Sequence, residues 1–92
     1  MKVAIVTGAY KGLGLEWCKQ LTIRGYQVIL TARNLKKAEQ AAEKLNELDL
    51  EVFPKKLDIT STADAKELYH WCLENFGHVD LVINNAGINS GT

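Results

Sequence analysis

Several features that mark whole classes of protein are scarce or missing in this chain. Its 92 residues include two cysteines and one proline, and 11 basic residues balance 11 acidic ones to give a net charge of zero. Balanced charge provides no field that would attract nucleic acid or an anionic membrane surface. The longest apolar runs are a few residues, whereas a membrane-spanning helix needs roughly 20. We therefore expect neither a nucleic-acid partner nor a membrane span.

The two cysteines, Cys18 and Cys72, form no Cys-x-x-Cys pair, and both lie in segments with helical periodicity. We expect buried, unreactive thiols rather than a disulfide or a redox pair. His70 is two residues from Cys72 on a predicted helix, so the two side chains point to different sides and make a poor metal pair. The sequence predicts no metal site. A strand pattern follows Lys2 at once, so no signal peptide is visible and we expect a cytoplasmic protein.

What the chain does contain is an alternation of two periodic patterns. Four apolar, β-branched segments recur at nearly even spacing: Val3–Val6, Gln27–Thr31, Val52–Leu57 and Val79–Ile83. Between them lie three segments with a period near 3.6 residues, carrying Leu13 to Arg24, Leu35 to Leu48 and Ala65 to Phe76. Strand and helix in alternation predict a parallel sheet with right-handed crossovers.

The expected fold is a three-layer α/β/α, Rossmann-type doubly wound sheet, truncated to βαβαβαβ, with strand order 3-2-1-4. Pro54 supports this order, because proline removes a ladder donor and belongs on an edge strand. Asn34 is the predicted N-cap of the second helix, and Ser61 with Asp64 predicts a capping box at the third. Ligands of such sheets bind at the carboxyl ends of the strands, between strands one and four.

The first strand runs into the glycine-rich stretch Thr7-Gly8-Ala9-Tyr10-Lys11-Gly12-Leu13-Gly14. The spacing G-x-x-x-G-x-G differs from the common G-x-G-x-x-G fingerprint, and no Gly-Lys-Ser/Thr follows to make a triphosphate-binding loop. Glycines let the backbone approach a phosphate, and the free amides of the first helical turn point at it. We interpret the stretch as a pyrophosphate grip, in which valine at Gly14 should block the approach. The alternative is a turn that only packs the helix against the strand.

The end of the second strand distinguishes NAD from NADP in such sites. An acidic residue there binds the ribose 2′-hydroxyl and repels a 2′-phosphate. This chain has Arg33 instead, about 20 residues beyond Gly14, and its planar guanidinium suits a phosphate. Lys11 offers a second positive charge nearby. These residues favour NADP(H) over NAD(H), the alternative being that Arg33 is only a solvated residue ahead of a helix.

The chain resembles the short-chain dehydrogenase/reductase family over its whole length, and most of all its NADPH-preferring, carbonyl-reductase-like members. The matching features are Thr7-Gly8-x-x-x-Gly12-x-Gly14, Arg33 after strand two, Leu57-Asp58-Ile59 after strand three and Asn84-Asn85-Ala86-Gly87 after strand four. The last motif, behind the strand Val-Asp-Leu-Val-Ile and combined with the glycine turn, is the most specific.

The resemblance implies a role for each matching residue. The pyrophosphate and adjacent ribose would be wrapped by Gly8, Gly12, Leu13 and Gly14, and the 2′-phosphate held by Lys11 and Arg33. Asp58 would accept from the adenine amino group beside the backbone of Ile59, while Asn85, Ala86 and Gly87 would line the adenosine side and steady the sheet. Asp58 also has a purely local interpretation, as a turn residue two places before Thr60.

The catalytic residues that the family requires are not in this chain. Family members use a Tyr-x-x-x-Lys pair and a Ser to move a proton beside the hydride donor, but Tyr10, Tyr26 and Tyr69 have no Lys four residues later. We therefore expect residues 1–92 to be the NADP-binding domain of an oxidoreductase acting on a small carbonyl or alcohol substrate, inactive alone. Strand four would be an exposed edge prone to self-association. One alternative is a non-catalytic NADP-binding module or regulator. A weaker one is a methyltransferase, which would require an acidic residue at the position of Arg33.

Overall fold

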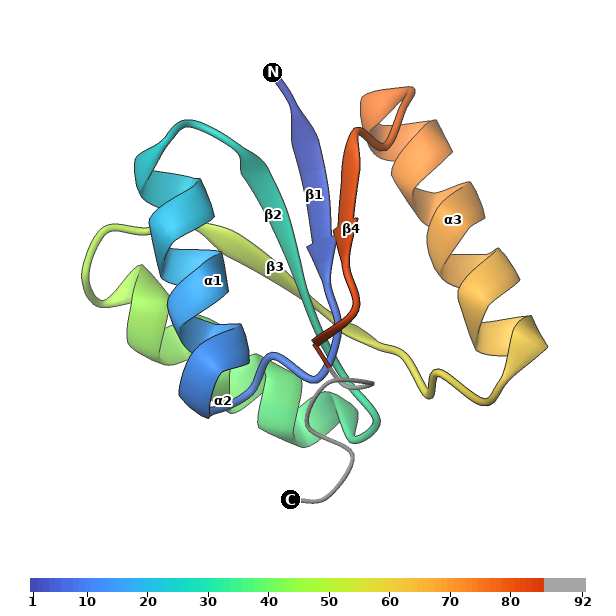
Figure 1. The fold of residues 1–92 in the computed structure, drawn as a ribbon, viewed down its shortest axis with the longest axis horizontal. Coiled ribbons are helices and arrows are strands. Elements are labelled where there is room, and N and C mark those ends of the chain that lie inside the picture. Colours follow the sequence, from blue (N-terminus) through green and yellow to red (C-terminus); the bar gives the residue numbers. More distant parts are fainter. Residues whose placement is uncertain (86–92) are drawn as a thin grey trace.

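The computed structural model describes residues 1–85, in which a four-stranded parallel sheet is flanked by three helices (Figure 1). The elements are β1 (Val3–Val6), α1 (Gly12–Ile23), β2 (Gln27–Ala32), α2 (Leu35–Asn46), β3 (Val52–Lys56), α3 (Thr62–Phe76) and β4 (Leu81–Ile83). The strand order is β3-β2-β1-β4 and all neighbours are parallel. The predicted fold class and strand order are confirmed.

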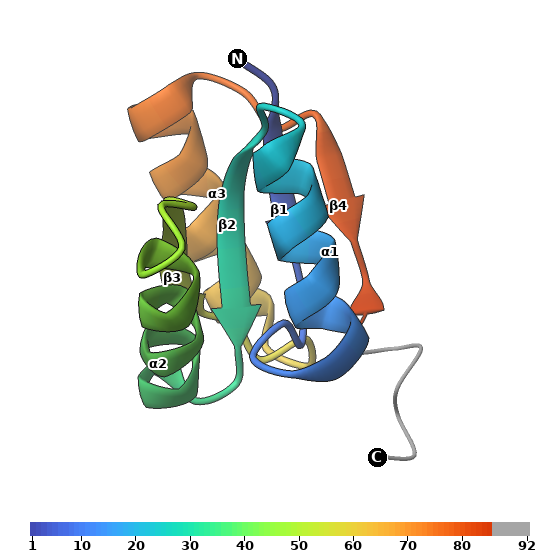
Figure 2. The same ribbon diagram turned by 90° about the vertical axis from the view of Figure 1, so that its left-hand side faces the viewer.

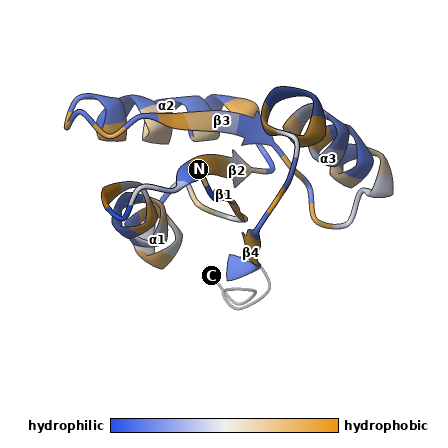
Figure 3. Cartoon of the chain, turned by 90° about the horizontal axis from the view of Figure 1, so that it is seen from above, coloured by the Kyte–Doolittle hydropathy of each residue, from blue (hydrophilic) through white to orange (hydrophobic). Residues whose placement is uncertain are grey.

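Helices cover both faces of the sheet. α1 and α2 pack on one face and α3 on the other, as Figures 1 and 2 show. The central strands β1 and β2 are apolar along most of their length because both of their faces are covered, and Figure 3 shows them between the helices. Cys18 lies in the core under α1 and Cys72 in the core under α3, so both thiols are buried and free as predicted. Burial raises the pKa of Cys18 to about 12, which keeps this thiol protonated.

The two edges of the sheet differ in their protection. β3 forms one edge and contains Pro54, in agreement with the sequence. β4 forms the other edge, where Val82 is 58% exposed. β4 is shorter than predicted and begins at Leu81 rather than Val79. The reason is that the Asp80 carboxylate accepts the Val3 amide at 2.7 Å, in place of a backbone carbonyl.

The helices follow the sequence with three differences, two at their ends and one on the buried face of α1. Asn34 caps α2 by accepting from the amides of Lys36 and Lys37 at 2.9 and 3.3 Å. Ser61 caps α3 by accepting the Asp64 amide, but the capping box is incomplete because the Asp64 carboxylate accepts the Asp58 amide instead.

The second difference is that α2 ends at Asn46, and the chain turns away through Asp49 at φ 61°. Leu48 is exposed as a result. The third lies in α1, whose buried face carries Gly14, Cys18 and Leu21, so that Leu13 and Trp17 point outward.

Candidate functional site

The turn between β1 and α1 is fixed to the ends of neighbouring strands. The Ala9 amide donates to the Thr31 carbonyl at 2.9 Å, and the buried Thr31 hydroxyl donates to the Val6 carbonyl at 2.8 Å. Gly8 and Gly12 have φ of 57° and 59°, a left-handed conformation that is costly for residues with a Cβ. The chain therefore leaves the carboxyl end of β1 through a turn in which two positions, Gly8 and Gly12, favour glycine.

α1 begins differently from the other two helices. Within residues 1–85, its N-cap residue Lys11 makes no side-chain hydrogen bond to the first turn, which also lacks an acidic residue. α2 and α3 are capped by Asn34 and Ser61. The first amides of a helix have no acceptor within it and carry the positive end of its dipole. The start of α1 is therefore suited to an anion.

Gly14 is required for packing. A Cβ at this position would lie 2.6 Å from Asn85 Nδ2, 2.7 Å from the Gly8 carbonyl oxygen and 2.9 Å from Ala9 Cα. The expectation that valine here blocks the phosphate is therefore incomplete, because a Cβ at Gly14 already requires the turn or α1 to shift. Gly12 is the opposite case, since a Cβ there would meet no described atom within 4 Å.

The segment after β4 lies beside the turn and holds it. Asn85, which is 1% exposed, donates from Nδ2 to the Gly8 carbonyl at 3.1 Å. The Thr7 hydroxyl lies 3.1 Å from Asn84 Oδ1, and the Thr7 amide donates to the Ile83 carbonyl at 2.9 Å. Two segments far apart in the sequence thus meet where the sequence placed the site. Ala86 and Gly87 lie outside the described residues.

Arg33 and Asp58 meet at the ends of β2 and β3. Arg33 Nε lies 3.9 Å from Asp58 Oδ2, and the arginine side chain is 82% exposed. So long and exposed a pair contributes little and leaves the guanidinium available to another anion. Asp58 Oδ1 accepts from the Thr60 amide at 2.9 Å and from the Thr60 hydroxyl at 2.6 Å. These hydrogen bonds confirm the local interpretation of Asp58 as a turn residue. Together with the nearby charge of Arg33, which has a smaller effect, they lower the pKa of Asp58.

Lys37 was not predicted from the sequence. Its Nζ lies 4.9 Å from the centroid of the Tyr10 ring, and Lys11 Nζ lies 5.4 Å from the same centroid. The ring thus brings together an ammonium group from the glycine turn and one from the first turn of α2. The signal that could have revealed Lys37 is its place four residues after Arg33, just inside a helix that starts at the same edge of the sheet.

Two further predicted residues lie on the surface at this end of the molecule. Leu13 is 52% exposed in the first turn of α1, and Ile59 is 47% exposed in the loop after β3. Both side chains are therefore open to contact by a ligand rather than part of the core. The predicted site residues that the structure describes come from all four β-strand ends, and Figure 1 shows these loops at one end of the molecule.

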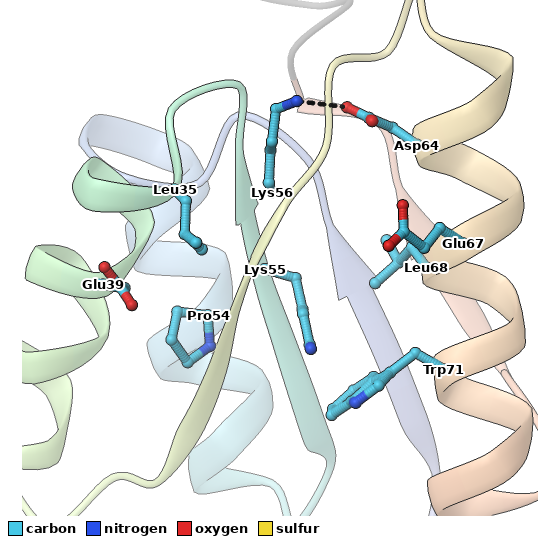
Figure 4. A pocket seen from close by; sticks show the side chains of 9 residues that line it. All are labelled: Leu35, Glu39, Pro54, Lys55, Lys56, Asp64, Glu67, Leu68 and Trp71. Carbon is cyan, nitrogen blue, oxygen red and sulfur yellow. Dashed lines mark ion pairs between the residues drawn. The ribbon is translucent and has the colours of Figure 1, made fainter.

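A separate pocket of about 420 Å³ lies at the β3 edge, between α2 and α3 (Figure 4). It is lined by Leu35, Glu39, Pro54, Lys55, Lys56, Asp64, Glu67, Leu68 and Trp71. None of these is a predicted cofactor residue. One ion pair lies within it, with Lys56 Nζ 3.6 Å from Asp64 Oδ2, and Lys55 Nζ lies 4.1 Å from the Trp71 ring centroid.

Two negative findings concern residues 1–85 only. No three or more His, Cys, Asp or Glu side chains gather there as a metal site would require. None of the helices in this part of the chain is long and apolar enough to cross a membrane.

Comparison with known proteins agrees with this geometry. A family model described as short chain dehydrogenase matches residues 2–92. The chain is 40% identical to a (+)-neomenthol dehydrogenase from Capsicum annuum over 92 residues, covering 96% of this chain and 29% of the relative.

Solved structures are similar too. Menthone neomenthol reductase from Mentha piperita superposes with a TM-score of 0.86 at 38% identity, covering 92% of this chain and 31% of that one. An alcohol dehydrogenase from Thermococcus sibiricus, complexed with 5-hydroxy-NADP, gives a TM-score of 0.76 at 37% identity, covering 89% and 35%. The chain therefore spans about a third of the length of the relatives it matches.

Proposed function

The chain belongs to the short-chain dehydrogenase family, and from this we propose that residues 1–92 are the NADP(H)-binding domain of an oxidoreductase. In this proposal the whole enzyme transfers a hydride between NADP(H) and a small carbonyl or alcohol substrate. The relatives support this class of reaction, since one is named a dehydrogenase and another a reductase.

The observation that carries the choice of cofactor is the positive charge at the end of β2. NADP differs from NAD by a 2′-phosphate, which an acidic residue at this place would repel. The structure has the exposed Arg33 there, with Lys11 and Lys37 on one aromatic ring in the adjoining turn and helix. A relative whose structure contains an NADP analogue is consistent with this choice.

The remaining residues fit the cofactor at separate positions. When bound, the nicotinamide supplies or accepts the hydride, and this chain holds the other parts. The uncapped start of α1 receives the diphosphate at Gly8, Gly12, Leu13 and Gly14. Asp58 retains acceptor capacity for the adenine amino group, since its local bonds from Thr60 use one oxygen. We assign the adenosine side to Ile59, Asn85, Ala86 and Gly87.

The alternative function is a module that binds NADP(H) without turnover. No tyrosine in the 92 residues is followed by lysine at the fourth place, so the chain has no Tyr-x-x-x-Lys pair to move the proton. NADPH oxidation by the whole protein in the presence of a ketone distinguishes the two functions, because residues 1–92 alone are expected to be inactive in either case.

The proposal is tested by titrating the chain calorimetrically with NADPH and NADH, as wild type and as Arg33→Asp. We expect wild type to bind NADPH at least about tenfold more tightly than NADH, because charge-assisted contacts to phosphate exceed 1.4 kcal/mol. Arg33→Asp should remove most of this preference and leave NADH affinity nearly unchanged.

Lys66→Asp is the matched control, since it makes the same change of charge at an exposed position of α3. This helix covers the face of the sheet opposite to α1 and α2. It should leave both affinities as in wild type. Equal losses for NADPH and NADH in Arg33→Asp, or a wild type without preference, would contradict the assignment.

A further inference from the structure

Tyr10 has a position that the proposed function does not yet use. It stands in the glycine turn, half-buried, and packs against the apolar core under α1 and α2. Two ammonium groups lie over its ring, Lys11 Nζ at 5.4 Å and Lys37 Nζ at 4.9 Å from the centroid. Both distances are within the roughly 6 Å over which the negative face of an aromatic ring attracts a cation.

This arrangement counteracts two effects that weaken the binding of an anion by a pair of lysines. Ammonium groups repel one another, and a free lysine side chain samples many rotamers that a binding partner must then restrict. A ring fixed by packing attracts both cations toward one point and reduces the rotamers that each samples. The ring thereby prepares, before any ligand binds, a pair of positive charges, one of them on the helix that follows Arg33.

We propose that Tyr10 is a positioning residue that sets the preference for NADP(H) over NAD(H), because its ring holds Lys11 and Lys37 where a 2′-phosphate lies. The inference rests on the proposed function and adds to it a residue that needs no contact with the phosphate itself. The ring face is the acting group, so the phenol hydroxyl is dispensable.

The test compares Tyr10→Leu with Tyr10→Phe in titrations with NADPH and NADH. Leucine keeps an apolar side chain against the core but has no ring, whereas phenylalanine keeps the ring and removes the hydroxyl. We expect Tyr10→Leu to reduce the ratio of NADPH to NADH affinity about tenfold, the effect of losing two exposed cation–π contacts. NADH affinity should stay close to wild type, and Tyr10→Phe should keep the wild-type ratio.

A second measurement separates positioning from a general loss of structure. In the Lys11→Met, Lys37→Met background the ratio is already low, and Tyr10→Leu should lower it no further, because coupled residues are not additive. The inference would be overturned if Tyr10→Leu left the ratio of NADPH to NADH affinity unchanged, or if Tyr10→Phe lowered that ratio as much as Tyr10→Leu does. It would also be overturned if Tyr10→Leu lowered the ratio about tenfold further in the protein that carries both lysine substitutions. The proposed function fails separately, if wild type itself shows no preference for NADPH.

Discussion

At the residue scale, the two glycines at the start of α1 have different physical roles. The spacing of the glycines identifies both positions, but sequence alone cannot separate them. Gly12 has a positive φ and open space around it, while Gly14 lies against the Gly8 carbonyl and Asn85. That second contact joins residues at opposite ends of the chain, so it depends on how β1 and β4 pair and no local pattern reveals it.

Gly14→Ala should destabilise the chain by about 1–3 kcal/mol, the usual effect of overpacking a close contact. This direction is opposite to the ordinary effect of alanine, which stabilises a helix interior relative to glycine by up to about 1 kcal/mol. Urea denaturation followed by circular dichroism measures the change. Glu16→Ala, on the exposed face of α1, is the control and should stay within about 0.5 kcal/mol. A more stable Gly14→Ala protein would show that the turn does not need the close approach.

At the scale of elements, the sequence predicts all seven helices and strands of residues 1–85 and their order in the sheet. It does so because hydrophobic period and helix caps are local properties. The errors lie at ends where a side chain accepts a backbone amide that the sequence pattern does not reveal. Asp80 accepts the Val3 amide and shortens β4, and Asp64 accepts the Asp58 amide and leaves its capping box incomplete.

The edge strand β4 leads to a prediction about association. We expect the 92-residue chain to self-associate through β4, whose Val82 is exposed and whose outer side pairs with no described strand. Val82→Lys should shift sedimentation velocity profiles toward monomer, because a charge on an edge disfavours pairing. Ile23→Lys, which removes an exposed apolar residue of α1 instead, should not. Wild type that stays monomeric across concentrations would refute the expectation.

At the scale of the whole molecule, the fold gathers charges from separate elements at the carboxyl end of the sheet. Lys11, Arg33 and Lys37 come from the glycine turn, the end of β2 and α2. The first two are predictable, because an alternating α/β pattern fixes where a glycine turn and the end of strand two must lie. The place of Lys37 just inside α2 could also have been predicted, but its contact with Tyr10 could not, because that contact depends on how α2 lies beside the turn.

The central claim is that the glycine turn holds a diphosphate while the cations beside it hold a 2′-phosphate. Heteronuclear NMR of the ¹⁵N-labelled chain, titrated with NADPH and with NADH, tests it most directly. The amides of Gly12, Leu13 and Gly14 should shift with both cofactors, and Arg33 Nε–H should shift with NADPH alone. Shifts confined to the pocket at the β3 edge, or an Arg33 response that is equal for the two cofactors, would contradict the account.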